Sequence, residues 1–173
     1  DLETAQIAVK AALTGHLVFS TLHTSSAASA LPRLLDLSAE TFLLASTVNA
    51  IVGQRIVRKI CPHCKESYIP PTQLVSEMQR VLGNLFTVQG EVKLYRGKGC
   101  TECGNLGYLG RIGIFEVFSV SEKVSRLILE RADVMAIERE AMAEGMITMK
   151  QDGYLKVLQG ETTIEEVLRV AQE

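Results

Sequence analysis

The stretch QRIVRKICPHC, residues 54–64, decides how this chain is divided. Residues 54–60 have the pattern of a strand with a basic edge, which belongs with the apolar sequence before them. From Cys61 to about Gly113 the chain becomes richer in Gly, Pro and polar residues. We therefore expect an α/β part that ends near residue 60 and is followed by a separate insert.

Four cysteines mark this insert, in two CxxC pairs: Cys61 with Cys64, and Cys100 with Cys103. Two thiolates three positions apart in a tight turn can both reach one ion, and two such turns complete a tetrahedral set of ligands. The pairs are separated by residues 65–99, a longer spacer than the roughly 15–20 residues of a zinc ribbon. The pattern predicts one zinc ion within a small subdomain.

Other interpretations of the four cysteines have less support in the sequence. Two disulfides would need an oxidising compartment, which nothing in the sequence marks. A thioredoxin-type site needs one CxxC pair, and a rubredoxin-like iron site is expected on a shorter, more aromatic module. Four thiolates leave no open position for a substrate, so the expected role is structural. His63, inside the first pair, is expected to face solvent.

Before the insert, apolar spacing predicts a helix over residues 2–14 and a short buried strand over 17–22. A hydroxyl-rich loop follows, and then a helix from residue 25 or 26 to about 35, which Pro32 should kink or shorten. Ser38 is a candidate N-cap for a further helix through about residue 52. The order of these elements favours mainly parallel strand pairing.

Within and after the insert the sequence predicts a helix at 72–82, strands at 92–95 and 111–120, and helices from Ser121 onward. Thr163 and Glu166 have the spacing of a capping box for a last helix. The tail is therefore predicted to be helical.

Composition narrows the class of protein. Apolar residues make up 47 % of the 173 residues, so a core can form, and there is no Trp. The formal net charge is −2, which gives no basic footprint for nucleic acid. No apolar run approaches the roughly 20 residues of a membrane span. The chain opens at Asp1 within a helical pattern and without Met, so we expect a fragment of a longer protein.

Several linked motifs resemble one known family. They are residues 1–5 (DLETA), 11–16 (AALTGH), 20–24 (STLHT), 33–35 (RLL), 54–58 (QRIVR), the CxxC pairs with Pro62, 107–108 (GY), 110–111 (GR) and 113–116 (GIFE). In this order they resemble the C-terminal ATPase domain of the secretion ATPases, the motors of type II secretion and type IV pilus assembly.

The resemblance implies the C-terminal part of a RecA-like α/β ATPase domain with a tetracysteine zinc-binding insert and a helical tail. Its implied parts are residues 1–60, the second half of the ATPase core; 61–113, the zinc-binding subdomain; and 114–173, a returning strand and helical region. In this family the four cysteines separate assembly and secretion motors from retraction motors.

The resemblance also implies a homohexamer at the cytoplasmic face of the bacterial inner membrane, peripheral to it. Its implied partners are the inner-membrane platform and the cytoplasmic-ring proteins, and its cofactors are ATP and Mg²⁺ beside the structural zinc. The family's P-loop, GxxxxGK[ST], and its acidic Walker B segment are both missing from residues 1–173. The chain alone is therefore expected to be inactive.

His23 is the candidate catalytic residue. It follows the predicted strand and precedes a helix start, where ligands gather in α/β sheets and where free N–H groups attract anions. Its resemblance to the family's histidine box implies a sensor of the γ-phosphate. Thr21 and Thr24 are expected to cap or satisfy the turn. Arg111 is expected to link the metal subdomain to the returning strand.

Arg55 and Arg58 fit two interpretations, a position toward nucleotide or a neighbouring subunit, and a charged strand edge. The main alternative function is a zinc-ribbon module that binds nucleic acid, and a second is a protein-docking module. A modest basic cluster favours the first alternative: Arg55, Arg58, Lys59, Lys65, Arg96 and Lys98. The acidic net charge and the lack of interleaved aromatic residues oppose it, so no nucleic-acid partner is expected.

Overall fold

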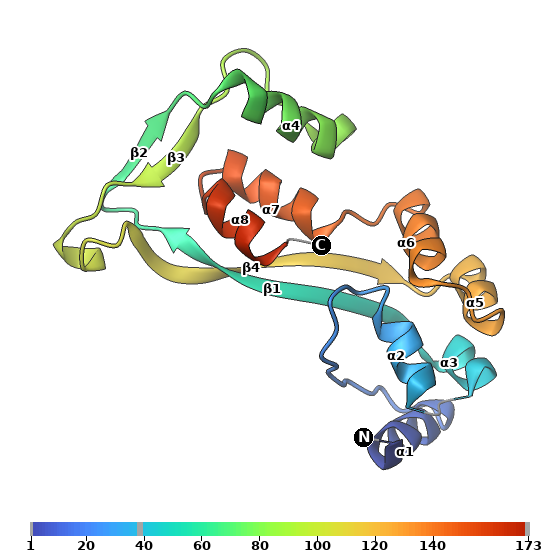
Figure 1. Cartoon of the computed structure of the whole chain (residues 1–173). Coiled ribbons are helices and arrows are strands. Elements are labelled where there is room, and N and C mark those ends of the chain that lie inside the picture. Colours follow the sequence, from blue (N-terminus) through green and yellow to red (C-terminus); the bar gives the residue numbers. More distant parts are fainter. Residues whose placement is uncertain (1, 38–39, 172–173) are drawn as a thin grey trace. The chain divides into compact units, whose positions relative to one another are not determined.

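The computed structural model describes residues 2–37 and 40–171 (Figure 1). The chain divides into two compact units. Unit 1 comprises the described residues of Asp1–Gly53 and Glu116–Ile147, and unit 2 those of Gln54–Phe115 and Thr148–Glu173. The described part of the chain contains both helices and strands, with three helices before the first strand and four after the last, so the expected α/β class is confirmed.

Unit 1 consists mainly of helices: α1 (Leu2–Leu13), α2 (Ala30–Asp36), α3 (Thr41–Thr47), α5 (Glu122–Leu129) and α6 (Val134–Ala143). It also holds the first residues of β1 (Ala50–Ile60) and the last residues of β4 (Tyr108–Ser119). Its aliphatic core centres on Leu31 and Leu44, which are fully buried, together with side chains from α5 and α6. Ala27 and Ala28, which follow the segment that carries His23, belong to this core.

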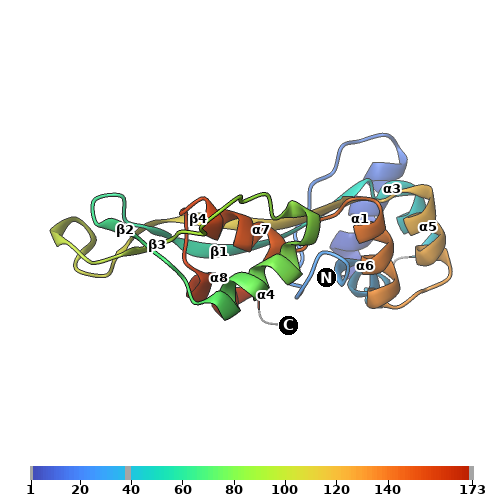
Figure 2. The same ribbon diagram turned by 90° about the horizontal axis from the view of Figure 1, so that it is seen from above.

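Unit 2 contains the remainder of β1 and β4, with β2 (Lys65–Tyr68) and β3 (Leu94–Gly97) between them in sequence. Its helices are α4 (Thr72–Leu82), the 3₁₀ turns η1 (Gly83–Leu85) and η2 (Thr101–Cys103), α7 (Met149–Leu158) and α8 (Ile164–Val170). Buried side chains of α4 and β3 pack on α7 and α8, and Figure 2 shows α4 beside α7. The insert is therefore built onto the C-terminal helices.

Strand pairing differs from the parallel order that the sequence favoured. The two sheets of the described residues are β1–β4 and β2–β3. Asn49 pairs with Val120 and Cys61 with Gly107, so residue numbers rise along one strand as they fall along the other. Tyr68 similarly pairs with Leu94 in the antiparallel β2–β3 ladder. The connection between β1 and β4 returns at the end where β1 stops, and such a return makes an antiparallel pair.

The predicted buried strand at 17–22 is wrong. Residues 16–24 have no regular structure, and Leu17 and Phe19 are 77 % and 88 % exposed. Neither sheet of the described part includes this segment, so no ladder pairs its backbone groups. An isolated extended segment cannot bury both faces, whatever its sequence.

Helix α2 is shorter than predicted because of Pro32. Residues 26–29 form a turn, and the helix begins at Ala30. Pro32 then lies in the first turn, where the missing N–H would have no partner within the helix. The expected shortening is confirmed.

The helix predicted up to residue 52 ends at Thr47. Ser38, its candidate N-cap, lies outside the described residues, and Glu40 precedes the first helical residue. Ile51 and Val52 belong to β1 instead. Their β-branched side chains favour extended backbone, which explains the early helix end.

The insert and tail follow the sequence more closely. Helix α4 has the predicted bounds of residues 72–82, β3 lies two residues later than predicted, and β4 begins three residues earlier, at Tyr108. Ser121 caps α5 by accepting a hydrogen bond from the Val124 N–H.

Candidate functional site

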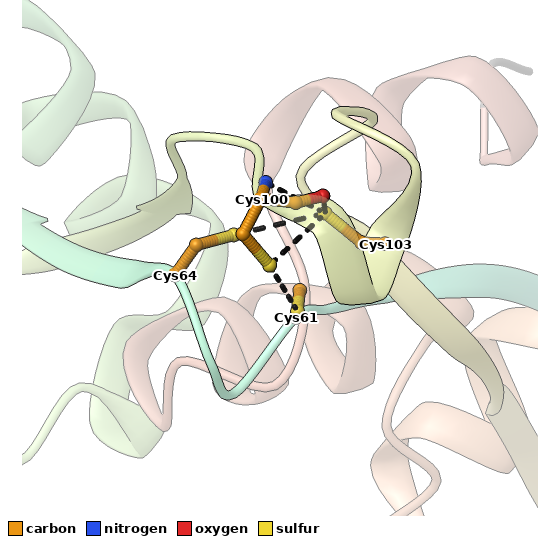
Figure 3. A group of neighbouring side chains, drawn as sticks. All are labelled: Cys61, Cys64, Cys100 and Cys103. Atoms are coloured by element: carbon orange, nitrogen blue, oxygen red, sulfur yellow. Dashed lines mark hydrogen bonds between the residues drawn. The ribbon is translucent and has the colours of Figure 1, made fainter.

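The four cysteine sulfurs of unit 2 lie within 4.8 Å of one another (Figure 3). The Sγ–Sγ distances are 3.8 Å from Cys61 to Cys100, 3.9 Å from Cys64 to Cys103 and 3.7 Å from Cys100 to Cys103. A tetrahedron with metal–sulfur bonds of about 2.3 Å has edges of about 3.8 Å. A disulfide would need sulfurs about 2.05 Å apart. The arrangement fits one tetrahedral ion such as zinc.

Both CxxC pairs are held by tight backbone turns. The first pair follows directly on β1, and the second pair brackets η2. Backbone N–H groups donate to the sulfurs, from Gly99 to Cys64 at 3.3 Å and from Cys100 and Gly107 to Cys103 at 3.2 and 3.3 Å. Such donors stabilise thiolates, which are the form of cysteine that binds metal.

The protonation of Cys103 reflects these contacts. Burial alone would raise the pKa of the Cys103 thiol, but the N–H groups of Cys100 and Gly107 and the neighbouring thiols lower it to about 6. A thiol with this pKa is largely ionised near neutral pH. His63 is exposed, as expected, and does not belong to the cluster of four cysteines.

A close backbone approach brings the two cysteine turns together. A Cβ placed on Gly97 would lie 2.0 Å from the carbonyl oxygen of Gly107. Gly107 itself has φ of +77°, a conformation that L side chains rarely adopt. Only glycine at residue 97 permits this approach, so Gly97 is part of the scaffold of the cysteine cluster. Sequence analysis assigned no role to it.

The strand that leads into the metal site is tied to α8. Glu166 accepts hydrogen bonds from the backbone N–H of Arg58 at 2.9 Å and from its guanidinium at 2.7 Å. Thr162 Oγ1 donates to the Arg58 carbonyl, and Thr163 Oγ1 lies 2.9 Å from the Tyr108 hydroxyl. Thr163 makes no side-chain cap on α8. The predicted capping box is therefore wrong: the helix begins where predicted, but both side chains contact the strands instead.

Most of the basic cluster around the cysteines is paired within unit 2. Arg58 is bonded to Glu166, Lys59 to Glu161, and Arg96 and Lys98 both to Glu66. Lys65 lies over the Tyr95 ring, with its Nζ 4.4 Å from the centroid. The ion pair between Arg58 and Glu166 supports the interpretation of Arg58 as part of a charged strand edge. Carboxylates thus offset most of the positive charge that a nucleic acid would need.

His23 lies in unit 1 and is exposed, within the irregular segment 16–24. The turn that follows is braced by hydroxyl groups. Thr24 Oγ1 donates to the Ser26 carbonyl, and Ser26 and Ser29 exchange bonds in which each Oγ accepts the other's backbone N–H. Thr24 satisfies the turn as expected, and Thr21 is exposed. The four cysteines, by contrast, belong to unit 2.

Glu116 is the residue near this turn that sequence analysis left without a role. Its side chain is buried, and its Oε1 accepts a hydrogen bond from the Ala27 N–H. The only sequence signal for it was its place at the end of the quoted motif GIFE, residues 113–116. Arg111, in the same strand, is exposed.

None of the helices in the described part of the chain combines the length and apolar character needed to cross a membrane.

Comparisons with known proteins agree with the motifs. Residues 1–169 match the family described as Type II/IV secretion system protein. The chain is 45 % identical over 174 residues to the type IV pilus assembly ATPase PilB of Pseudomonas aeruginosa, covering 100 % of this chain and 30 % of that protein. It is 46 % identical over 173 residues to type II secretion system protein E of Xanthomonas campestris pv. campestris, with the same two coverages.

The fold also resembles a solved structure, the pilus retraction motor PilT with bound ADP. The TM-score is 0.63 at 23 % identity, and the match covers 100 % of this chain and 37 % of that chain. The chain spans roughly a third of the length of the curated relatives it matches. The resemblance seen in the motifs is confirmed, and the chain belongs to the Type II/IV secretion system protein family.

Proposed function

We propose that this chain is part of an ATPase motor that drives type II protein secretion or type IV pilus assembly. One observation carries the proposal: the whole chain aligns at 45 % and 46 % identity with a pilus assembly ATPase and a type II secretion protein E. The reaction of the whole motor is hydrolysis of ATP to ADP and phosphate. Phosphate positioning and charge stabilisation dominate this chemistry.

Within the motor, the chain contributes the C-terminal part of a RecA-like domain. Residues 1–60 form the second half of the ATPase core, 61–113 the zinc-binding subdomain, and 114–173 the returning strand and helical region. The motor is a homohexamer, peripheral to the inner membrane on its cytoplasmic side. It engages the membrane platform and the cytoplasmic-ring proteins of the machine.

ATP and Mg²⁺ are held mainly by residues outside this chain. Residues 1–173 contain no GxxxxGK[ST] loop, so the chain alone does not hydrolyse ATP. His23 contributes the phosphate-sensing group. Its exposure in the irregular segment 16–24 leaves the imidazole accessible to a phosphate.

Zinc, held by the four cysteines, has a structural role. When bound it cross-links the turn after β1 to the η2 turn, through four thiolates that leave no open coordination position. The supporting observation is the set of Sγ–Sγ distances of 3.7–3.9 Å among them. Elemental analysis of the purified protein should find one zinc ion per chain and no iron. Two disulfides in its place would contradict this role.

The test of the motor uses the full-length protein and residues 1–173 in parallel. The full-length protein with Mg²⁺ and ATP should release phosphate, and residues 1–173 should not. His23→Ala in the full-length protein should lower kcat, whereas His63→Ala, which alters an exposed histidine outside the ligand set, should not. A full-length protein that binds zinc but hydrolyses no ATP would contradict the motor proposal.

A nucleic-acid-binding module is the weaker candidate. Four of the six residues in the basic cluster around the cysteines form ion pairs with Glu66, Glu161 and Glu166. A salt-dependent mobility shift of DNA by residues 1–173 would favour it.

A further inference from the structure

We propose that Glu116 is a positioning residue that anchors the turn behind His23. The inference rests on the proposed role of His23 and names a residue through which that role is supported. The contact joins residues 89 positions apart, Ala27 and Glu116, both within unit 1. It is therefore a tertiary contact that links the His23 segment to β4.

The contact between Glu116 and Ala27 is shielded from water. Glu116 is 6 % exposed, and its carboxylate accepts the N–H of Ala27, which is itself buried. A hydrogen bond to a charged acceptor is shorter and about twice as strong as one between neutral groups. An unpaired N–H at this buried position would carry the full cost of its desolvation.

Gly53 makes room for the carboxylate. A Cβ at residue 53 would lie 2.7 Å from Glu116 Cγ, 2.9 Å from its Oε1 and 3.1 Å from the Ala27 nitrogen. Any side chain at this position would press on both partners of the hydrogen bond. Gly53 on β1 therefore leaves space for Glu116 on β4 to bind the Ala27 N–H. We call this arrangement of Gly53, Glu116 and Ala27 the anchor.

The anchor acts on His23 through a short, braced connection. Between His23 and Ala27 lie Thr24, Ser25 and Ser26, and bonds from Thr24 and to Ser29 fix the backbone around Ser26. Ala27 and Ala28 are packed into the core of unit 1. Neither sheet of the described residues includes the irregular segment before Thr24, so this turn fixes the end of the segment that is nearer to His23.

The first experiment measures the anchor itself, in the full-length protein, by hydrogen–deuterium exchange with mass spectrometry. Glu116→Ala should speed exchange in a peptide covering residues 24–31 by about tenfold or more, since a buried amide loses its acceptor. Glu116→Gln should largely restore protection because its amide oxygen can accept the same bond. Glu130→Ala, which removes an exposed carboxylate from the same unit, is the matched control. Unchanged exchange in Glu116→Ala would overturn the proposal.

The second experiment measures the consequence for activity. In Glu116→Ala, kcat should fall by about tenfold to a hundredfold, because a misplacement of roughly 1 Å can have that effect. KM for ATP should change by less than about twofold, since Glu116 is not proposed to touch nucleotide. The His23→Ala, Glu116→Ala double variant should lose no more than the worse single variant. Additive losses, or a kcat that falls in His23→Ala but not in Glu116→Ala, would overturn the positioning role.

Failure of the proposed function gives a different result. If His23→Ala leaves kcat unchanged, the sensor role of His23 is wrong, and exchange in residues 24–31 alone decides whether Glu116 anchors the turn. If Glu116→Ala does not fold, Gly53→Ala provides the same test, because it retains the carboxylate but displaces it. Gly53→Ala should then show faster exchange and a lower kcat, and normal values for both would overturn the proposal.

Discussion

The guanidinium of Arg58 lies 2.7 Å from the carboxylate of Glu166, which connects the strand before the metal site to α8. The Glu166 side chain is 2 % exposed and also receives two hydrogen bonds from Arg169, at 3.1 and 2.9 Å. Its fourth donor is the backbone N–H of Arg58. The carboxylate thus accepts four hydrogen bonds, and it fixes the end of β1 that leads directly to Cys61.

Removing this carboxylate should destabilise the protein. Glu166→Ala leaves the Arg58 N–H and both guanidinium groups without their acceptor. Both arginine side chains are half exposed and can rehydrate, so we expect a loss of about 1–3 kcal/mol, at or below the usual cost of breaking a buried pair. Urea unfolding measures the loss. Glu165→Ala, an exposed acidic position in the same helical turn, should change the unfolding free energy far less.

The same carboxylate should make stability depend on pH. Burial alone would raise the pKa of Glu166, but hydrogen bonds from Arg169 and Arg58 lower it from its ordinary value of 4.5 to about 2. The folded state therefore gains stability from ionised Glu166 above about pH 4.5, and this gain is lost as the pH falls toward 2. The stability difference between wild type and Glu166→Gln should shrink on acidification from pH 6 to pH 3. A constant difference would show that Glu166 does not titrate as described.

Metal removal should loosen the cysteine turns. Without an ion, no metal–sulfur bonds hold the four sulfurs, which lie about 3.8 Å apart, in this cluster. The Cys103 thiol, whose pKa is lowered to about 6, is also readily ionised. A strong chelator should lower the midpoint of thermal unfolding, and added zinc should restore it. Cys103→Ser should reduce the zinc content measured by elemental analysis. Full zinc content in that variant would mean that Cys103 is not a ligand.

Gly97→Ala should impair the metal site without changing a ligand. The new methyl group would overlap the Gly107 carbonyl at 2.0 Å, so the two cysteine turns would have to separate. We expect weaker zinc retention in a chelator competition assay. Gly90→Ala is the control, because it adds a methyl group in open space at a positive φ. Equal zinc retention in the two variants would contradict this account of the scaffold.

Local signals predicted some elements well and others poorly. Helix α4 was predicted to the residue because its apolar spacing and the Pro71 before it are local features. The segment around Phe19 looked like a buried strand, but burial depends on neighbours that a local pattern does not specify. The capping spacing at Thr163 was real, yet its hydroxyl bonds Tyr108, 55 residues away. The hydrogen bond between Glu116 and Ala27 could not be predicted for the same reason, because its two residues are 89 positions apart in the sequence.

The cysteine turns, by contrast, could be predicted as a group. Paired thiols at CxxC spacing have few uses, so residue identity alone pointed to a shared ion. The sequence did not predict which residues hold these cysteine turns in place. The glycine approach at Gly97 and the link from Arg58 to Glu166 both join segments distant along the chain. Such contacts have no local periodicity to detect.

The hydrogen bond from the Cys61 N–H to the Gly107 carbonyl means that the chain leaves β1 and returns to β4 at nearly the same point. A single in-frame deletion between these positions could rejoin the strands through a hairpin. It would also uncover Tyr154 and Val157, which are buried against the excised segment. Loss of this segment would therefore expose apolar surface on α7, so we expect the deletion to destabilise unit 2 unless the sequence of α7 also changes.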